Sequence, residues 1–234
     1  MKKILIIIPT YNEVNNIKML INDIFKYVKN FDLLFIDDNS PDKTSAIIKK
    51  FQLKKKNIFL FSRKKKSGIG SAHKLGLNWG FKKKYKKIIT MDGDGTHHPK
   101  YLKKMLKKSN KSHLIITNRF LKKNSLYGWS LTRIFITNLR HFLIKILLGF
   151  SYDASGALRC YNTSKINIKY INEAKDNGYS FFWESLYIFH KKNFIIKEIP
   201  ITLPSRSTGS SKMKISDIFY ALFYLIKIFY KNNK

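Results

Sequence analysis

The chain has 234 residues, of which 44% are hydrophobic and 15% are aromatic. This composition is sufficient for the core of one large domain and excludes a wholly disordered chain. Cys160 is the single cysteine, which excludes an intramolecular disulfide and a cysteine-rich metal knuckle. With 46 Lys and Arg residues against 14 Asp and Glu residues, the formal net charge of +32 is compatible with a solvated basic surface, an anionic membrane or a nucleic acid as partner.

The first half of the chain alternates between strand and helix patterns. Short apolar, β-branched segments predict strands at residues 3–9, 32–37, 57–62, 86–91 and 113–117. Apolar residues recur at helical spacing over 17–28 and 72–79, while Ser40-Pro41 and Pro99 are typical helix starts. The alternation predicts a Rossmann-like α/β fold, with a mostly parallel sheet and helices on both faces. Ligands of such sheets bind beyond the carboxyl ends of the strands.

The second half predicts a long helix at 127–150, another helix at 178–192 and a strand at 193–203. Its tail, residues 215–231, contains nine consecutive apolar residues at 218–226, whereas a membrane-spanning helix needs roughly 20. A helix lying in the plane of a membrane interface and an ordinary core-packing helix are both compatible with this pattern.

The strongest chemical signal is Met91-Asp92-Gly93-Asp94, which follows directly after the strand predicted at 86–91. Two carboxylates separated by one residue can share a divalent cation, and Mg²⁺ or Mn²⁺ prefers such hard oxygen ligands while bridging to a substrate diphosphate. Gly93 would leave room for a sugar or ribose near the backbone. By itself, the pattern is also typical of a tight turn, because turns favour Asp and Gly.

Polar side chains also follow the first two predicted strands. Residues 9–13 read Pro-Thr-Tyr-Asn-Glu, and residues 37–42 read Asp-Asp-Asn-Ser-Pro-Asp. A carboxylate at these positions can accept hydrogen bonds from a base or ribose, and Tyr11 can lie against a base. Residues 66–70, Lys-Ser-Gly-Ile-Gly, precede a predicted helix and can bring backbone amides near a phosphate. The first strand–helix turn lacks GxGxxG, which argues against a dinucleotide cofactor.

Arginine is rare among the basic residues, with six examples at positions 63, 119, 133, 140, 159 and 206. Where lysine is the default cation, a retained arginine indicates a need for its planar fork, which grips a carboxylate or phosphate through two parallel hydrogen bonds.

Nine segments follow one another from about residue 4 to residue 212: IPTYNE, IDDNSPDKT, SGIGSA, MDGDGTHHP, TNRF, YGW, DASGALRCY, GYSFFWE and PSRSTGSSK. In this order they resemble the dolichol-phosphate (polyprenyl-phosphate) mannosyltransferases of glycosyltransferase family 2. The resemblance implies a GT-A fold and an inverting transfer of mannose from GDP-mannose to a polyprenyl phosphate, with Mg²⁺ or Mn²⁺ as cofactor. We therefore expect a GT-A catalytic domain over 1–212 and an amphipathic C-terminal helix over 213–234.

The resemblance also implies roles for individual residues. Those expected to hold the nucleotide are Pro9, Tyr11, Glu13, Ile36 and Asp38. Those expected around the diphosphate and metal are Asp92, Gly93 and Asp94, with Asp94 as a direct metal ligand and Thr96 as a second. Those expected to contact phosphates of the donor or acceptor are Arg119, Arg206 and Lys212. Catalysis is accordingly expected from Asp92, Asp94, Arg119, Arg206 and Lys212.

A polyprenyl phosphate already carries an anionic oxygen, so its attack on the sugar needs no general base. The site must instead offset the repulsion between two phosphate groups, which suits a metal and a cluster of cations. His97 and His98 are therefore interpreted as structural. Residues 207–211 are interpreted as a mobile loop that brings Lys212 over the bound donor.

Two alternatives remain open at this point. The same fold could use another nucleotide sugar, such as UDP-glucose or UDP-GlcNAc, or another acceptor. A nucleic-acid binder would combine aromatics and cations on one face without clustered carboxylates, so a nucleic acid is not expected as partner. The lysine excess and aromatic tail instead predict peripheral binding at the cytoplasmic face of an anionic membrane, and a membrane-anchoring subunit is left open.

Overall fold

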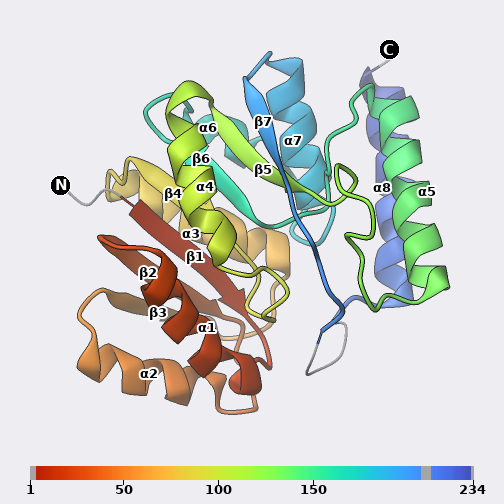
Figure 1. Ribbon diagram of the computed structural model, residues 1–234. Helices are drawn as coiled ribbons and strands as arrows, with labels where there is room; N and C mark the ends of the chain where they lie inside the picture. Colours follow the sequence, from red (N-terminus) through yellow and green to blue (C-terminus); the bar gives the residue numbers. More distant parts are fainter. Residues whose placement is uncertain (1–3, 207–211, 233–234) are drawn as a thin grey trace.

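The computed structural model describes residues 4–206 and 212–232 (Figure 1). Its strands are β1 (Ile4–Thr10), β2 (Phe31–Asp37), β3 (Ile58–Ser62), β4 (Lys87–Thr90), β5 (Leu114–Asn118), β6 (Arg159–Asn162) and β7 (Ile196–Pro200). Its helices are α1 (Val14–Tyr27), α2 (Thr44–Lys54), α3 (Ile69–Lys82), α4 (Lys100–Lys108), α5 (Leu131–Leu148), α6 (Ile168–Asn172), α7 (Phe181–Lys191) and α8 (Ile215–Asn232), with a 3₁₀ turn at Ser109–Lys111.

Within the described residues, the strands form one mixed sheet in the order β3-β2-β1-β4-β6-β5-β7. Strands β1 to β4 run parallel to one another, and β5 and β7 form a second parallel pair. Strand β6 lies between β4 and β5 and runs antiparallel to both. The predicted fold class, a mixed and mostly parallel sheet in an α/β protein, is confirmed.

Two cores lie on opposite faces of the sheet because successive side chains of a strand point to opposite faces. Along β1, Leu5 and Ile7 belong to one core and Ile6 and Ile8 to the other, all four without exposed surface. The first core contains residues of α3, α5, α6, α7 and α8, while the second contains residues of α1, α2 and α4 (Figure 1). Helices therefore cover both faces, as expected.

Strand β6 and the start of α2 differ from the sequence-based expectation. The four residues of β6, Arg-Cys-Tyr-Asn, carry no strand pattern, and the strand forms because two neighbours pair with it.

Helix α2 begins at Thr44 rather than at Pro41, and the Asp42 carboxylate accepts a hydrogen bond from the Thr44 amide at 3.0 Å. The Ser40 hydroxyl instead accepts one from the Asn12 amide at 3.0 Å, which joins the ends of β1 and β2. The predicted helix start at Pro99 is confirmed within one residue.

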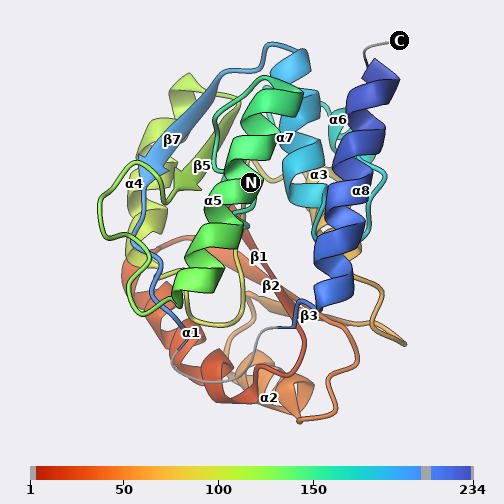
Figure 2. The ribbon, with the colours of Figure 1, turned by 90° about the vertical axis from the view of Figure 1, so that its right-hand side faces the viewer.

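Helices α5 and α8 lie side by side at one end of the molecule (Figures 1 and 2). One face of α8 packs on α7, where Leu225 is buried and the Tyr224 hydroxyl donates to Glu184 at 2.9 Å. The core-packing interpretation is therefore confirmed for this face, while the opposite face of α8 is exposed and apolar. Among the described helices, none combines the length and the apolar character that crossing a membrane requires.

Candidate active site

The ends of three parallel strands bring the predicted acidic residues together. Strand β1 lies between β2 and β4, so the segments that follow all three strands meet at one edge of the sheet. The Thr10 hydroxyl donates to Asp37 at 3.0 Å, and the Asp38 amide donates to the Thr10 carbonyl at 3.0 Å. The sequence-based expectation that these polar clusters share one edge is therefore confirmed.

Asp38, predicted to hold the nucleotide, has both carboxylate oxygens engaged by the protein. Arg63 forms an ion pair with one oxygen, and the Ser67 amide donates to the other at 3.2 Å. The same guanidinium donates to the Ser71 hydroxyl at 2.6 Å and to the Gly68 carbonyl at 3.1 Å. Arg63 thereby ties the end of β2 to the start of α3, a role that sequence reasoning missed although the scarcity of arginine singled it out.

The glycines at the start of α3 serve close packing rather than an evident phosphate cradle. Gly68 has a φ of +94°, and a Cβ built there would lie 2.3 Å from the Asn177 carbonyl oxygen. A Cβ on Gly70 would lie 2.6 Å from the Cβ of Phe181. The Ser71 amide already donates to the Asn177 carbonyl at 3.0 Å. The geometry gives this segment a packing role, and the amides of Ser67 and Ser71 are taken by protein acceptors.

Asp94 is only 6% exposed, so the acidic loop is more deeply buried than a surface turn. Its Oδ1 accepts hydrogen bonds from the hydroxyl of Thr96 at 2.7 Å and from the amide of Thr96 at 3.1 Å. Its Oδ2 accepts one from Nε of Arg206 at 2.7 Å. The sequence-based expectation that Gly93 leaves room for a sugar or ribose is not met. A Cβ built there would lie 3.3 Å from the Pro9 carbonyl oxygen of β1.

Asp92 differs from Asp94 in having no cationic partner among the ion pairs of the described residues. Burial raises the pKa of Asp92, and the neighbouring Asp94 charge raises it further. His97 approaches Asp92 with 3.3 Å between Nδ1 and Oδ2, but burial lowers the pKa of His97 to about 4. Neutral His97 instead accepts the Asp92 amide through Nδ1 at 3.3 Å, which fits the structural role expected for it.

The donor set of this loop fits a hard divalent cation that completes its coordination with substrate oxygens. The two carboxylates and the Thr96 hydroxyl are oxygen ligands of the kind that Mg²⁺ and Mn²⁺ prefer. Over the described ranges, no group of three or more His, Cys, Asp or Glu side chains is arranged to hold a metal. A cation bound at Asp92 and Asp94 would therefore need further oxygens from a diphosphate and from water.

Arginines from the other half of the sheet face this loop. Arg119, just after β5, donates through Nε to Asp153 at 2.6 Å and is 6% exposed. Burial raises the pKa of Asp153, but the charge and hydrogen bonds of Arg119 outweigh it and hold that pKa below its usual range. Arg133, on the first turn of α5, stacks on Trp129 at 3.5 Å from the ring centre. Burial lowers the pKa of Arg133, and so do the charges of Arg206 and Arg119.

Arg133 is a residue of this cluster that sequence reasoning did not include in the site. Its rarity as an arginine was the available signal, and only its contact with Trp129 places it beside Arg119. The Trp129 indole nitrogen is buried and has no hydrogen-bond partner in the described structure. An N–H donor and two guanidinium groups thus lie close together, an arrangement suited to an anionic oxygen.

The residues after β1 that the sequence predicts to hold the nucleotide lie close to Lys212 or Lys66. Its ammonium group donates to Oε1 of Glu13 at 2.8 Å and to the Asn12 carbonyl at 3.2 Å. Lys66 lies 4.5 Å from the ring centre of Tyr11, whose ring is half-buried. Ile36 is completely buried in the core, so its side chain packs beneath the strand ends and does not line the site surface. Residues 207–211, predicted as a mobile loop, lie outside the described residues.

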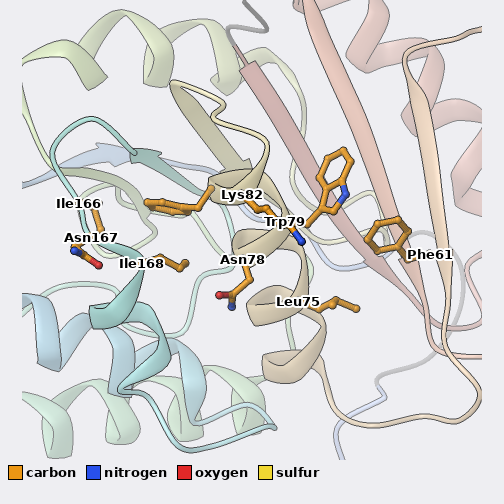
Figure 3. A pocket seen from close by; sticks show the side chains of 9 residues that line it. Phe61, Leu75, Asn78, Trp79, Lys82, Ile166, Asn167 and Ile168 are labelled. Atoms are coloured by element: carbon orange, nitrogen blue, oxygen red, sulfur yellow. The ribbon is translucent and has the colours of Figure 1, made fainter.

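A separate groove of about 720 Å³ opens between α3 and the segment before α6 (Figure 3). Its lining is mostly apolar and comprises Phe61, Leu75, Asn78, Trp79, Phe81, Lys82, Ile166, Asn167 and Ile168. None of the predicted site residues lines it, so this groove is distinct from the carboxylate and arginine cluster.

Comparison with known proteins finds relatives that match most of the chain. The chain is 28% identical over 225 residues to polyprenol monophosphomannose synthase of Mycolicibacterium smegmatis, covering 95% of this chain and 85% of the relative. It is 28% identical over 212 residues to undecaprenyl-phosphate mannosyltransferase of Micrococcus luteus, covering 90% and 87% of the two chains. The resemblance to polyprenyl-phosphate mannosyltransferases is thereby confirmed.

Solved structures share the fold at low sequence identity. Glucosyl-3-phosphoglycerate synthase from Mycobacterium tuberculosis, solved with Mn²⁺ and UDP, has a TM-score of 0.67 at 16% identity, covering 96% of this chain and 77% of that one. TarS 1-349 of S. aureus has a TM-score of 0.61 at 15% identity, and the chain spans only 65% of its length. The family profile described as Glycosyl transferase family 2 matches residues 5–167. This chain is therefore a glycosyltransferase and belongs to glycosyl transferase family 2.

Proposed function

We propose that this enzyme transfers mannose from GDP-mannose to a polyprenyl phosphate, such as dolichyl phosphate, with inversion at the anomeric carbon. The observation that carries the proposal is the opposition of two charge clusters across one site. Asp92 and Asp94 lie on one side, Arg119 and Arg133 lie beside Trp129 on the other, and Arg206 pairs with Asp94 between them. Two curated relatives that match most of the chain carry names with a polyprenol-linked mannose product or an undecaprenyl-phosphate acceptor, which supports this choice.

The donor would lie over the ends of β1, β2 and β4. Pro9, Tyr11, Glu13 and Asp38 are proposed to contact the nucleotide, with Ile36 supporting them from the core. Asp94 and Asp92, with Thr96 nearby, would hold Mg²⁺ or Mn²⁺ against the donor diphosphate. When bound, that cation supplies charge neutralisation to the leaving diphosphate.

The acceptor phosphate would lie among Arg119, Arg133 and Trp129. Arg119 is held by Asp153 through its Nε, which fixes the direction of its remaining N–H groups. The buried Trp129 N–H, without a partner in the described residues, would donate to the same phosphate. Arg206 and Lys212 approach from the segment after β7 and would contact the donor diphosphate or the acceptor phosphate.

The chemistry follows from the acceptor's own charge. An anionic phosphate oxygen attacks C1 of the sugar, the new C1–O bond forms on the face opposite the leaving group, and the bond to the diphosphate breaks. The electron pair leaves with the nucleoside diphosphate, and no proton has to be removed from the nucleophile. The arginines lower the repulsion between the two phosphate groups and stabilise the charge that develops on the diphosphate.

The exposed faces of α5 and α8 support peripheral binding to the headgroup layer of a membrane. On α5, the exposed apolar residues Leu131, Phe135, Leu139, Phe142 and Ile146 lie opposite the buried Thr137, Ile144 and Leu148. On α8, they are Ile215, Phe219, Leu222, Phe223, Ile226 and Tyr230, opposite the buried Leu225. The two helices lie side by side (Figure 2). Arg133, which is proposed to contact the acceptor phosphate, is on α5.

A bilayer is the occupant that fits this apolar surface because the acceptor's lipid tail remains in the membrane. The net charge of +32 adds attraction to anionic lipids, which would place the enzyme at the cytoplasmic face. A separate membrane-anchoring subunit covering the same surface is the competing arrangement. Binding of the purified chain alone to anionic vesicles separates the two.

The deciding experiment incubates the protein with polyprenyl phosphate, Mg²⁺ or Mn²⁺, and GDP-mannose, GDP-fucose, UDP-glucose or UDP-GlcNAc in parallel. With the sugar of each donor labelled, we expect more labelled sugar in the lipid extract from GDP-mannose than from the other donors. The matched acceptor control is the corresponding polyprenol, which lacks the phosphate and should accept no sugar. Preferential transfer from a UDP-sugar would replace the proposed donor, while transfer to the free alcohol would contradict the base-free chemistry.

A further inference from the structure

The two cations of the segment after β7 each neutralise a carboxylate that the proposed function assigns to the donor. Arg206 pairs with Asp94 at 2.7 Å, and Lys212 pairs with Glu13 at 2.8 Å. The two pairs reach back 112 and 199 residues along the chain. Arg206 and Lys212 thus contact the segments that follow β4 and β1, respectively.

Both carboxylate oxygens of Asp94 accept hydrogen bonds from protein groups in this arrangement. Thr96 donates twice to Oδ1, and Arg206 donates to Oδ2. Asp94 is 6% exposed and Arg206 has a side chain that is 24% exposed, so the pair is shielded from water on the carboxylate side. A cation that binds Asp94 at Oδ2 has to displace the guanidinium from it.

Glu13 is saturated in the same way. Its Oε1 accepts from Lys212, and its Oε2 accepts from the side-chain amide of Asn16 at 2.7 Å. A nucleotide that uses Glu13 therefore competes with Lys212. The displaced Lys212 and Arg206 are then positive charges beside the site, and both suit a diphosphate as the new acceptor.

We infer that Arg206 and Lys212 act as internal counter-cations, so that metal and nucleoside diphosphate bind as one coupled unit and each binds weakly alone. This inference rests on the proposed function, because it takes Asp94 as a metal ligand. Metal alone breaks the Arg206–Asp94 pair and leaves the guanidinium without that carboxylate. The diphosphate removes this penalty by accepting the released cation, and by linkage the metal strengthens nucleotide binding by the same factor.

The test measures Mn²⁺ binding directly, by the electron paramagnetic resonance signal of free Mn²⁺, in the presence and absence of saturating GDP. For the unmodified chain we expect Mn²⁺ to bind at least about tenfold more tightly when GDP is present. Arg206→Ala should bind Mn²⁺ alone about threefold or more tightly than the unmodified chain, and GDP should then strengthen Mn²⁺ binding by a smaller factor than in the unmodified chain. Arg206→Lys, which keeps the charge without the fork, should fall between the two.

Arg133→Ala is the matched control, because it removes an equal charge from the same neighbourhood without touching Asp94. It should raise Mn²⁺ affinity far less than Arg206→Ala. If Arg206→Ala leaves Mn²⁺ affinity unchanged or lowers it, or if Arg133→Ala has an equal effect, the counter-cation inference is overturned while metal binding stands. If the unmodified chain fails to bind Mn²⁺ even when GDP or UDP is present, the proposed function itself fails.

Discussion

In the half of the sheet formed by β1, β2 and β4, every site carboxylate follows a strand end within a few residues. Glu13 follows β1, Asp38 follows β2, and Asp92 and Asp94 follow β4. The half formed by β5 and β7 supplies cations, two of which lie away from a strand end. Arg119 follows β5, Arg133 lies on α5, and Arg206 lies beyond β7.

The contrast supports different roles for the two groups of residues in the proposed site. Carboxylates on short connections between core strands have little freedom to move, which suits a fixed metal and nucleotide platform. Arg133 lies on α5 and Arg206 lies beyond β7, and we expect such cations to exchange one anionic partner for another. Four predictions test this division, from the largest expected effect to the smallest.

Asp94→Asn removes one carboxylate charge from the fixed platform and should have the largest effect. We expect transfer to fall by at least about a thousandfold, since several kcal/mol of charge stabilisation at the diphosphate are lost. Turnover is measured as labelled lipid, and circular dichroism checks the fold because Asp94 is buried. Near-normal turnover of a folded Asp94→Asn protein in Mg²⁺ would show that Asp94 does not hold the metal.

Arg206→Ala and Lys212→Ala address the two cations that follow β7. We expect turnover to fall by about a hundredfold, as for loss of a donor to developing charge, and GDP binding to weaken much less. Arg206→Lys should restore little, because a point charge does not reproduce the planar fork. The checks are kcat at saturating donor and GDP affinity by calorimetry. Equal losses in both would move these residues to the donor side alone.

The membrane surface of the second half should have a smaller effect, on binding rather than chemistry. Replacing Phe135 and Phe142 of α5 and Phe219 and Phe223 of α8 with Ser removes exposed apolar area without touching the packed faces. Flotation with anionic vesicles should show retained binding at low salt and several-fold weaker binding at high salt, because only the lysine attraction is screened. Vesicle binding that is unchanged by these substitutions at either salt concentration would remove the membrane assignment of α5 and α8.

The last prediction concerns the packing contact between the two halves, here called the seam. His73 of α3 lies in this contact against Phe181 and Phe182 of α7. Burial lowers the pKa of His73 to about 3, so the folded protein holds it neutral while the unfolded chain protonates it near pH 6.5. Its contribution to stability is therefore present above about pH 6.5 and is lost as pH falls toward 3, at up to about 1.4 kcal/mol per pH unit.

His73→Phe should flatten the acid side of the stability curve between about pH 6 and 4. Urea unfolding at several pH values measures it, and His190→Phe, at a half-buried position on α7, is the comparison variant. An identical pH dependence in the His73→Phe and unmodified proteins would mean that His73 is not held neutral at this seam.

Much of the proposed donor site could be predicted from residues alone. Apolar runs that end in Asp-Asp or Asp-Gly-Asp indicate buried strands with acidic exits, and neighbouring parallel strands bring their carboxyl ends to one edge. Asp94, Glu13 and Asp38 were located in this way or through the motifs beside them, and all three lie at that edge. Local geometry was sufficient because each residue is within a few positions of its strand.

The tertiary structure alone decided what depends on contacts between distant residues. The antiparallel β6, whose four residues carry no strand pattern, exists because β4 and β5 pair with it. The engagement of Asp38 by Arg63, the packing of Gly93 against β1 and the inclusion of Arg133 through Trp129 follow from how the elements pack. The pairing of Arg206 with Asp94 joins residues 112 positions apart, and sequence periodicity carries no information about which charges meet over such a distance.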